Sequence, residues 1–189
     1  MAEGQIVSGF KEGAIYGVGI VDVPIASLWA ALTDETRQPK YTAITHSEII
    51  SGKACESGRK ILQILDVPVP FVADRWWIGL PKENGRLMRD SGGAVRELAF
   101  SSSVDPDLVT NESGKKYISK ASPIGHSKGG WFLVALGARE TYVEYHAYSD
   151  PGSGIPSGVA NQLAAGGVKK NILAMAKFAK EGNPSCPIQ

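Results

Sequence analysis

Glu140-Thr-Tyr-Val-Glu-Tyr-His-Ala-Tyr-Ser149 and the residues that follow, Asp150-Pro-Gly-Ser-Gly-Ile-Pro156, decide the fold of this chain. The first stretch has the alternating side chains of a strand, and the second is a turn signal. Helical spacing of apolar residues begins directly after it and continues to Lys180. A strand that leads into one long C-terminal helix predicts a sheet packed against that helix, with room for a ligand between them.

The predicted helix carries two apolar stripes. Ile155, Val159 and Leu163 form the first, and the second consists of Val168, Ile172, Met175 and Ala179. The double glycine Gly166-Gly167 lies between them and predicts a weak or bent point in the helix, because glycine is a poor helix former. Gly182 and Pro184 predict its end.

The rest of the chain predicts strands with two short helices near the start. Residues 14–22 form the first strand, Pro24 opens a helix, and a second short helix covers residues 33–39. Further strands are expected at 43–51, 59–67, 71–80, 94–104, 117–122, 128–137 and 139–149. No helix is expected between residues 40 and 149, and residues 105–116 are expected to form a mobile loop. Sequential strands with short connections predict an antiparallel sheet with helices on one face, an α+β fold.

The composition predicts one soluble domain over residues 1–189, with a core at about 14–180. A net charge of +1 gives no electrostatic argument for nucleic acid. The sequence shows neither a signal peptide nor a run long enough to span a membrane, which predicts a cytoplasmic location. Cys55 and Cys186 are far apart in the sequence, so free thiols are expected rather than a disulfide or a metal pair.

Two motifs resemble those of a known family. Residues 65–77, Leu-Asp-Val-Pro-Val-Pro-Phe-Val-Ala-Asp-Arg-Trp-Trp, resemble the START (StAR-related lipid-transfer) pattern of an apolar strand, a proline turn and an Asp-Arg-aromatic strand start. Residues 130–133 and 142–157 are similar to the paired final strands, the Asp-Pro-Gly turn and the Ile-Pro helix start of the same family. The resemblance covers residues 14–180 and points to the bacterial START-like branch of the SRPBCC, or Bet v 1-like, superfamily. It implies the helix-grip fold, a curved antiparallel sheet around a long C-terminal helix.

The resemblance also implies a ligand site under that helix for a lipid or another hydrophobic molecule, sterol-like or acyl. In sterol-binding relatives the arginine at the position of Arg75 faces the cavity and pairs with an acidic residue on the preceding strand. Gln63 and Asp66 are the candidates here, and a glutamine in that place alters the pair. The alternative is a surface Arg75 beside Asp74 or Asp66. The other ligand-binding residues expected from the family are Trp77, Trp131, Leu133, Val143, Tyr145, Val159 and Leu163, for which plain core packing is the alternative.

Three functions follow, and the first is binding of a hydrophobic ligand for transfer or sensing. It needs no catalytic machinery, and the sequence has no catalytic or metal-binding motif, so no cofactor or metal is expected. The expected partners are the ligand and a transient membrane contact of a monomer, with gates at residues 105–116, 123–130 and 152–154. The second function is a polyketide cyclase or aromatase that uses the same cavity, with Arg75, Trp77 and Tyr145 as anchors. The third is a structural or partner-binding module with a filled core.

Overall fold

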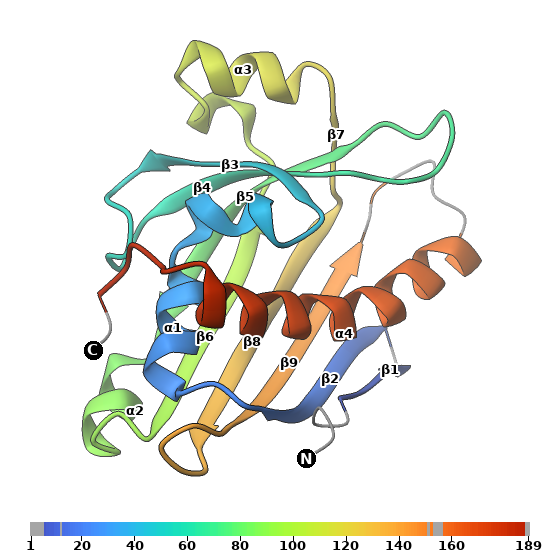
Figure 1. Ribbon diagram of the computed structural model, residues 1–189. Coiled ribbons are helices and arrows are strands. Elements are labelled where there is room, and N and C mark those ends of the chain that lie inside the picture. Colours follow the sequence, from blue (N-terminus) through green and yellow to red (C-terminus); the bar gives the residue numbers. More distant parts are fainter. Residues whose placement is uncertain (1–5, 12, 151, 153–156, 188–189) are drawn as a thin grey trace.

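The protein folds as a single curved sheet closed by one long helix (Figure 1). The structure is a computed structural model that describes residues 6–11, 13–150, 152 and 157–187, with only the backbone at residue 11 and at 157–166. The elements are β1 (Val7–Lys11), β2 (Ala14–Val21), α1 (Ile25–Thr33), the 3-10 helix η1 (Glu35–Lys40), β3 (Ile44–Ser51), β4 (Lys60–Leu65), β5 (Arg75–Glu83), α2 (Gly85–Asp90), β6 (Val95–Ser103), the 3-10 helix η2 (Pro106–Leu108), α3 (Glu112–Ile118), β7 (Ser122–Pro123), β8 (His126–Ala135), β9 (Thr141–Asp150) and α4 (Ser157–Glu181).

The sheet runs β1-β2-β9-β8-β6-β5-β4-β3 with antiparallel neighbours, and the two-residue strand β7 pairs in parallel with β5. Helix α4 crosses the concave side of the sheet, and α1 lies beside the last turns of α4 (Figure 1). We call this covered side the inner face and the opposite side the outer face. The arrangement is the α+β helix-grip fold that the sequence predicted.

The main core lies between α1, α4 and the inner face of β2, β6, β8 and β9. Cross-strand pairing places Trp131 opposite Tyr145 and Leu133 opposite Val143, so these side chains share the inner face. The second stripe of α4 packs against them, and Val168, Ile172 and Met175 are at most 2% exposed. Both final strands therefore turn these side chains toward α4. The predicted helix end is confirmed, because α4 stops at Glu181.

Helix α4 packs closely over Gly17 on β2. A Cβ atom at this position would lie 2.4 Å from Cγ1 of Val168 and 3.0 Å from Cδ1 of Ile172. Gly17→Ala is expected to lower the free energy of unfolding by about 1–3 kcal/mol, because the added methyl overpacks the contact. Urea unfolding measures this, with Gly137→Ala as the control, since a Cβ there meets nothing within 4 Å. An equal effect of both substitutions would contradict this close packing.

The expectation of no helix between residues 40 and 149 is wrong, because α2, η2 and α3 lie in that range. Each begins at a polar residue that the sequence pattern had suggested as a turn or loop. Asn84 Oδ1 accepts a hydrogen bond from the amide of Leu87, and Asn111 Oδ1 accepts one from the amide of Gly114. Asparagine and aspartate favour both turns and helix N-caps, because their short side chains accept a hydrogen bond from a nearby backbone amide in either structure. The predicted loop at 105–116 is therefore mostly the helical pair η2 and α3.

Two strand predictions also need correction. Residues 117–122 were expected to form a strand, but α3 continues to Ile118 and only Ser122 and Pro123 join the sheet. Edge strand β1 was not predicted, and it pairs with β2 from Val7 opposite Val18 to Lys11 opposite Ala14. Its glycine and charged residues, with only five positions, give a weak strand pattern.

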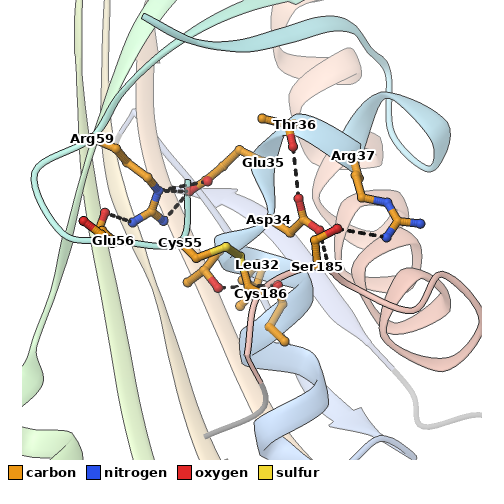
Figure 2. The surroundings of a disulfide bond; sticks show 12 residues. Leu32, Asp34, Glu35, Thr36, Arg37, Cys55, Glu56, Arg59, Ser185 and Cys186 are labelled. Carbon is orange, nitrogen blue, oxygen red and sulfur yellow. Dashed lines mark hydrogen bonds and ion pairs between the residues drawn. A yellow bond between two sulfur atoms is a disulfide. The ribbon is translucent and has the colours of Figure 1, made fainter. Parts of the chain in front are cut away.

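The expectation of free thiols is wrong as well, because Cys55 and Cys186 form a disulfide (Figure 2). Their Cα atoms lie 5.4 Å apart although 131 residues separate them in the sequence. Cys55 lies in the β3–β4 loop and Cys186 in the segment after α4. The fold brings the loop and this segment together, and sequence separation carried no information on that distance.

Side chains of η1 and the residue before it hold the same end of α4. Arg37 donates hydrogen bonds to the carbonyl oxygens of Gly182 at 2.7 Å and Asn183 at 2.6 Å. Asp34 Oδ2 accepts a hydrogen bond from the amide of Ser185 at 2.7 Å (Figure 2). A cation at the C-terminus of a helix is electrostatically favourable. The C-terminal end of α4 is thus fixed by a disulfide and by charge-assisted hydrogen bonds.

Candidate functional site

The hydrophobic side chains of the described residues form two separate clusters. The first is the main core beneath α4, and the second lies on the outer face between β4, β5 and the η2–α3 segment. The outer cluster contains Leu62, Ile64, Trp76, Ile78 and Val109. Residues that alternate with these on β4 and β5 point to the inner face, and they belong to neither cluster.

This inner wall of β4 and β5 carries polar and aromatic side chains. Gln63 lies opposite Trp77, and Leu65 lies opposite Arg75. Gly79 follows on β5 and faces Ser102 of β6, which continues the wall toward Phe100. Gln63 and Trp77 are both half-buried. Alternation along the strand predicted the shared face of Arg75, Trp77 and Gly79, and the register agrees with it.

Arg75 is buried, with 3% of its surface exposed, so it is not the surface arginine of the alternative interpretation. Its Nη1 donates to the carbonyl oxygen of Ala73 at 2.6 Å. Asp74 accepts a hydrogen bond from the amide of Val67, and Asp66 is exposed beyond the end of β4. Of the two predicted partners, Gln63 shares the inner wall with Arg75. It lies two residues before Leu65, the residue that pairs with Arg75 across the strands.

Tyr145 lies on the inner face of β9, which β8 and β6 separate from β5, and it packs against the main core. Its ring centroid is 4.5 Å from that of Trp131 and 6.1 Å from that of Phe100. Burial raises the pKa of Tyr145 to about 12. Nevertheless the residue is half-buried rather than fully buried, and its hydroxyl has no hydrogen-bond partner among the described residues. The phenol can donate a hydrogen bond at neutral pH but cannot act there as a base.

The titration of Tyr145 gives a direct check of this environment. The folded pKa of about 12 lies above the ordinary 10.0, so the stabilising contribution is complete below pH 10 and is lost as the pH rises through 12. Phenolate absorbance near 295 nm is measured against pH for the wild type and for Tyr145→Phe. The two titration curves are expected to differ by one group that ionises near pH 12. A difference centred on pH 10 would contradict the desolvated position.

The other predicted site residues divide into three groups. Trp131, Leu133 and Val143 pack in the main core and are 7%, 0% and 0% exposed. Val159 and Leu163 belong to the part of α4 whose side chains lie outside the described residues. Sequence reasoning missed Ser47 on β3, which pairs with Gln63 and whose Oγ is buried without a hydrogen-bond partner among the described residues. Within the same described part of the chain, no cluster of three or more His, Cys, Asp or Glu side chains is suited to a metal ion.

Comparison with solved structures identifies this architecture. A STAR-related lipid transfer protein from Xanthomonas axonopodis matches with a TM-score of 0.68 and 18% sequence identity, over 94% of this chain and 99% of that chain. Human STARD10 matches with a TM-score of 0.65 and 15% identity, over 96% of this chain and 74% of that chain. The Zhui aromatase/cyclase from Streptomyces sp. R1128 matches with a TM-score of 0.61 and 13% identity, over 88% of this chain and 93% of that chain.

No protein-family model matches the sequence, and no curated protein does. At identities below 20% the structural matches establish the fold, and function must be argued from the site. The chain has the helix-grip fold of the START-related lipid-transfer domains, which polyketide aromatase/cyclases share.

Proposed function

We propose that this protein binds a lipid or another hydrophobic small molecule, sterol-like or acyl, for transfer or sensing. The ligand lies between the inner wall of β3–β5 and helix α4. The observation that supports this most is that the apolar wall residues Ile61 and Trp77 belong to neither hydrophobic cluster of the described residues. A wall with aromatic surface and a few polar groups, one of them charged, is typical of small-molecule sites.

Two further observations support the proposal. Tyr145 is desolvated and yet half-buried, as expected for a side chain that borders an internal space. The structural neighbours include proteins named for lipid transfer, from Xanthomonas axonopodis and from human. Binding requires no catalytic group, and the neutral phenol of Tyr145 suits a hydrogen bond to a ligand.

Gly79→Leu tests the location of the ligand. A Cβ at Gly79 meets its nearest atoms at 3.6–3.9 Å, which is ordinary contact, so the leucine side chain extends over the wall without backbone strain. It is expected to weaken binding of the apolar fluorophore N-phenyl-1-naphthylamine by at least about tenfold, because it occupies ligand volume. Far-UV circular dichroism checks the fold, and Gly137→Ala is the control. Unchanged binding in a folded Gly79→Leu protein would refute this site.

We further propose that the β4–β5 loop contacts the donor membrane. Phe71 in this loop is fully exposed and has a φ of 65°, an unusual conformation for a bulky residue. Figure 1 shows the loop at the same end of the molecule as the first turns of α4, opposite the end fixed by the disulfide. Ligand entry at the end of the helix away from the disulfide agrees with both features.

Phe71→Ser is expected to slow transfer of a fluorescent lipid between vesicles by about tenfold, because a buried phenylalanine contributes roughly 1.5–3 kcal/mol to membrane contact. The amount of lipid bound at equilibrium is expected to stay the same. Leu136→Ser is the matched control, since Leu136 is an exposed apolar residue after β8. Equal slowing by both substitutions would argue against a specific contact of this loop.

A second candidate is the cyclase or aromatase, favoured by the structural match to the Zhui enzyme. Arg75, Trp77 and Tyr145 would then hold a reactive chain in shape. Turnover of a model polyketide that is lost in Arg75→Ala would favour this function. Ligand binding without turnover would favour the transfer or sensing function.

The disulfide weighs against the cytoplasmic location expected from the sequence, because disulfides persist mainly in oxidising compartments. No helix of the described residues is long and apolar enough to cross a membrane. We propose an oxidising compartment, which thiol labelling of the protein taken directly from its native cells would test. Unreactive Cys55 and Cys186 are expected.

A further inference from the structure

We infer that Ser47, Gln63 and Trp77 form an uncharged hydrogen-bonding subsite, centred beside Gly79, that binds a hydroxyl or carbonyl group of the ligand. The inference rests on the ligand-binding function proposed above and specifies the class of ligand. It separates neutral polar lipids, such as long-chain alcohols, ketones and sterols, from fatty acids and from pure hydrocarbons.

The three side chains form one row across three adjacent strands. Ser47 on β3 lies opposite Gln63 on β4, and Gln63 lies opposite Trp77 on β5. Directly paired residues have Cβ atoms about 4.5–5.5 Å apart, so Gln63 can share a ligand group with either neighbour, Ser47 or Trp77. The next residues on β3, His46 and Glu48, face the outer side, where His46 stacks on Tyr117 of α3.

Gly79 leaves the centre of the subsite bare. The position of a Cβ at Gly79 would lie 3.6 Å from Oε1 of Gln63 and 3.9 Å from Nε1 of Trp77. A hydrogen-bond acceptor and a donor therefore converge on one spot that carries no side chain. An oxygen atom of a hydroxyl group can accept from the indole N–H and donate to the amide oxygen at the same time.

The polar groups of this row have no hydrogen-bond partner within the part of the chain that the structure describes. Ser47 Oγ is buried without a hydrogen bond, and the side chains of Gln63 and Trp77 make no hydrogen bond to the described residues. A buried polar group without a partner costs about 1–3 kcal/mol. A ligand oxygen that bonds to the row would remove this cost, whereas a hydrocarbon would leave it in place.

The charge of the row decides the ligand class. Ser47, Gln63 and Trp77 carry no charge, and the buried Arg75 directs Nη1 to the carbonyl oxygens of Ala73 and Asp74 at the start of β5. A carboxylate at Gly79 would lie in a desolvated wall beside the acceptor oxygen of Gln63, which disfavours an anion. A neutral oxygen meets no such cost.

Displacement of N-phenyl-1-naphthylamine by 1-tetradecanol, tetradecane and tetradecanoate tests the subsite. For the wild type we expect 1-tetradecanol to displace the fluorophore at a concentration about tenfold lower than tetradecane, as one or two hydrogen bonds allow. Tetradecanoate is expected to be weaker than the alcohol. Ser47→Ala and Gln63→Leu are expected to reduce the preference for the alcohol, taken as the ratio of the two displacing concentrations within each variant, to about threefold or less.

Ser101→Ala serves as the matched control, because Ser101 is exposed on the outer face of β6. Ser47→Ala should fold as well as the wild type, since it removes an unpartnered buried hydroxyl. Equal displacement by alcohol and alkane, a preference for tetradecanoate, or a preference retained in both variants would overturn the subsite and leave the proposed ligand site standing. A wild type that does not bind the fluorophore at all would overturn both.

Discussion

Arg59→Leu is expected to lower the free energy of unfolding by about 3–5 kcal/mol, because it leaves the buried carboxylate of Glu35 and the half-buried one of Glu83 without their cation. Nε of Arg59 donates to both carboxylate oxygens of Glu35 at 3.1 and 3.0 Å, and Nη1 donates to Glu83 at 3.1 Å. The arginine side chain is 0% exposed. Burial alone would lower the pKa of Arg59, but Glu35 and Glu83 raise it above its ordinary value. Urea unfolding at pH 7 measures the loss.

Arg86→Leu is the control, because the ion pair of Arg86 with Asp90 is exposed and such pairs contribute at most about 1 kcal/mol. The loss in Arg59→Leu is expected to be larger at pH 8 than at pH 5. Burial raises the pKa of Glu35, and Arg59 opposes this rise in the wild type. Without Arg59 the folded pKa of Glu35 rises further, so the destabilisation grows as the pH rises from the unfolded pKa of this carboxyl toward its raised folded pKa. Losses of equal size in the two arginine variants would contradict the assigned role.

Removal of the disulfide in Cys55→Ala/Cys186→Ala is expected to lower the free energy of unfolding by about 3–5 kcal/mol, since the bond closes a long loop of the unfolded chain. Alanine is chosen because Cys186 is buried and a serine would place a hydroxyl there. Unfolding experiments with and without a reducing agent measure the effect. The wild type should lose stability on reduction, and the double variant should not respond.

The same substitution also tests the anchor of α4. Hydrogen exchange of the last turns of α4 is expected to accelerate in the double variant, while Arg37 still holds Gly182 and Asn183. Arg37→Ala in the double variant should accelerate it further. Exchange rates that stay at the wild-type level would show that the disulfide does not fix this end of the helix.

The sequence predicted the parts of the fold in which local pattern and tertiary structure agree. One such part is the unit of β9 and α4, because an alternating strand pattern, a turn signal and helical spacing follow each other directly in its sequence. The α3 helix was missed because Asn111 is equally suited to a turn and to an N-cap. The disulfide and the Arg59 cluster were missed because both join segments distant in sequence.

The candidate site was predictable where strand alternation decides the face. Arg75 and Trp77 were placed correctly on one side of β5, with Gln63 on the neighbouring strand. Ser47 could not be found in this way. A register shift between Ile44 and His46 interrupts the alternation of β3, and a serine in a strand usually indicates a solvated face. Only the paired register assigns it to the inner wall.

Native mass spectrometry of the protein, purified without detergent, tests the central claim most directly. We expect a complex with one hydrophobic molecule, which denaturation releases and which is reduced or absent in Gly79→Leu. A wild type that carries no such molecule, and that takes up neither N-phenyl-1-naphthylamine nor fluorescent lipids or sterols, would contradict the proposed function.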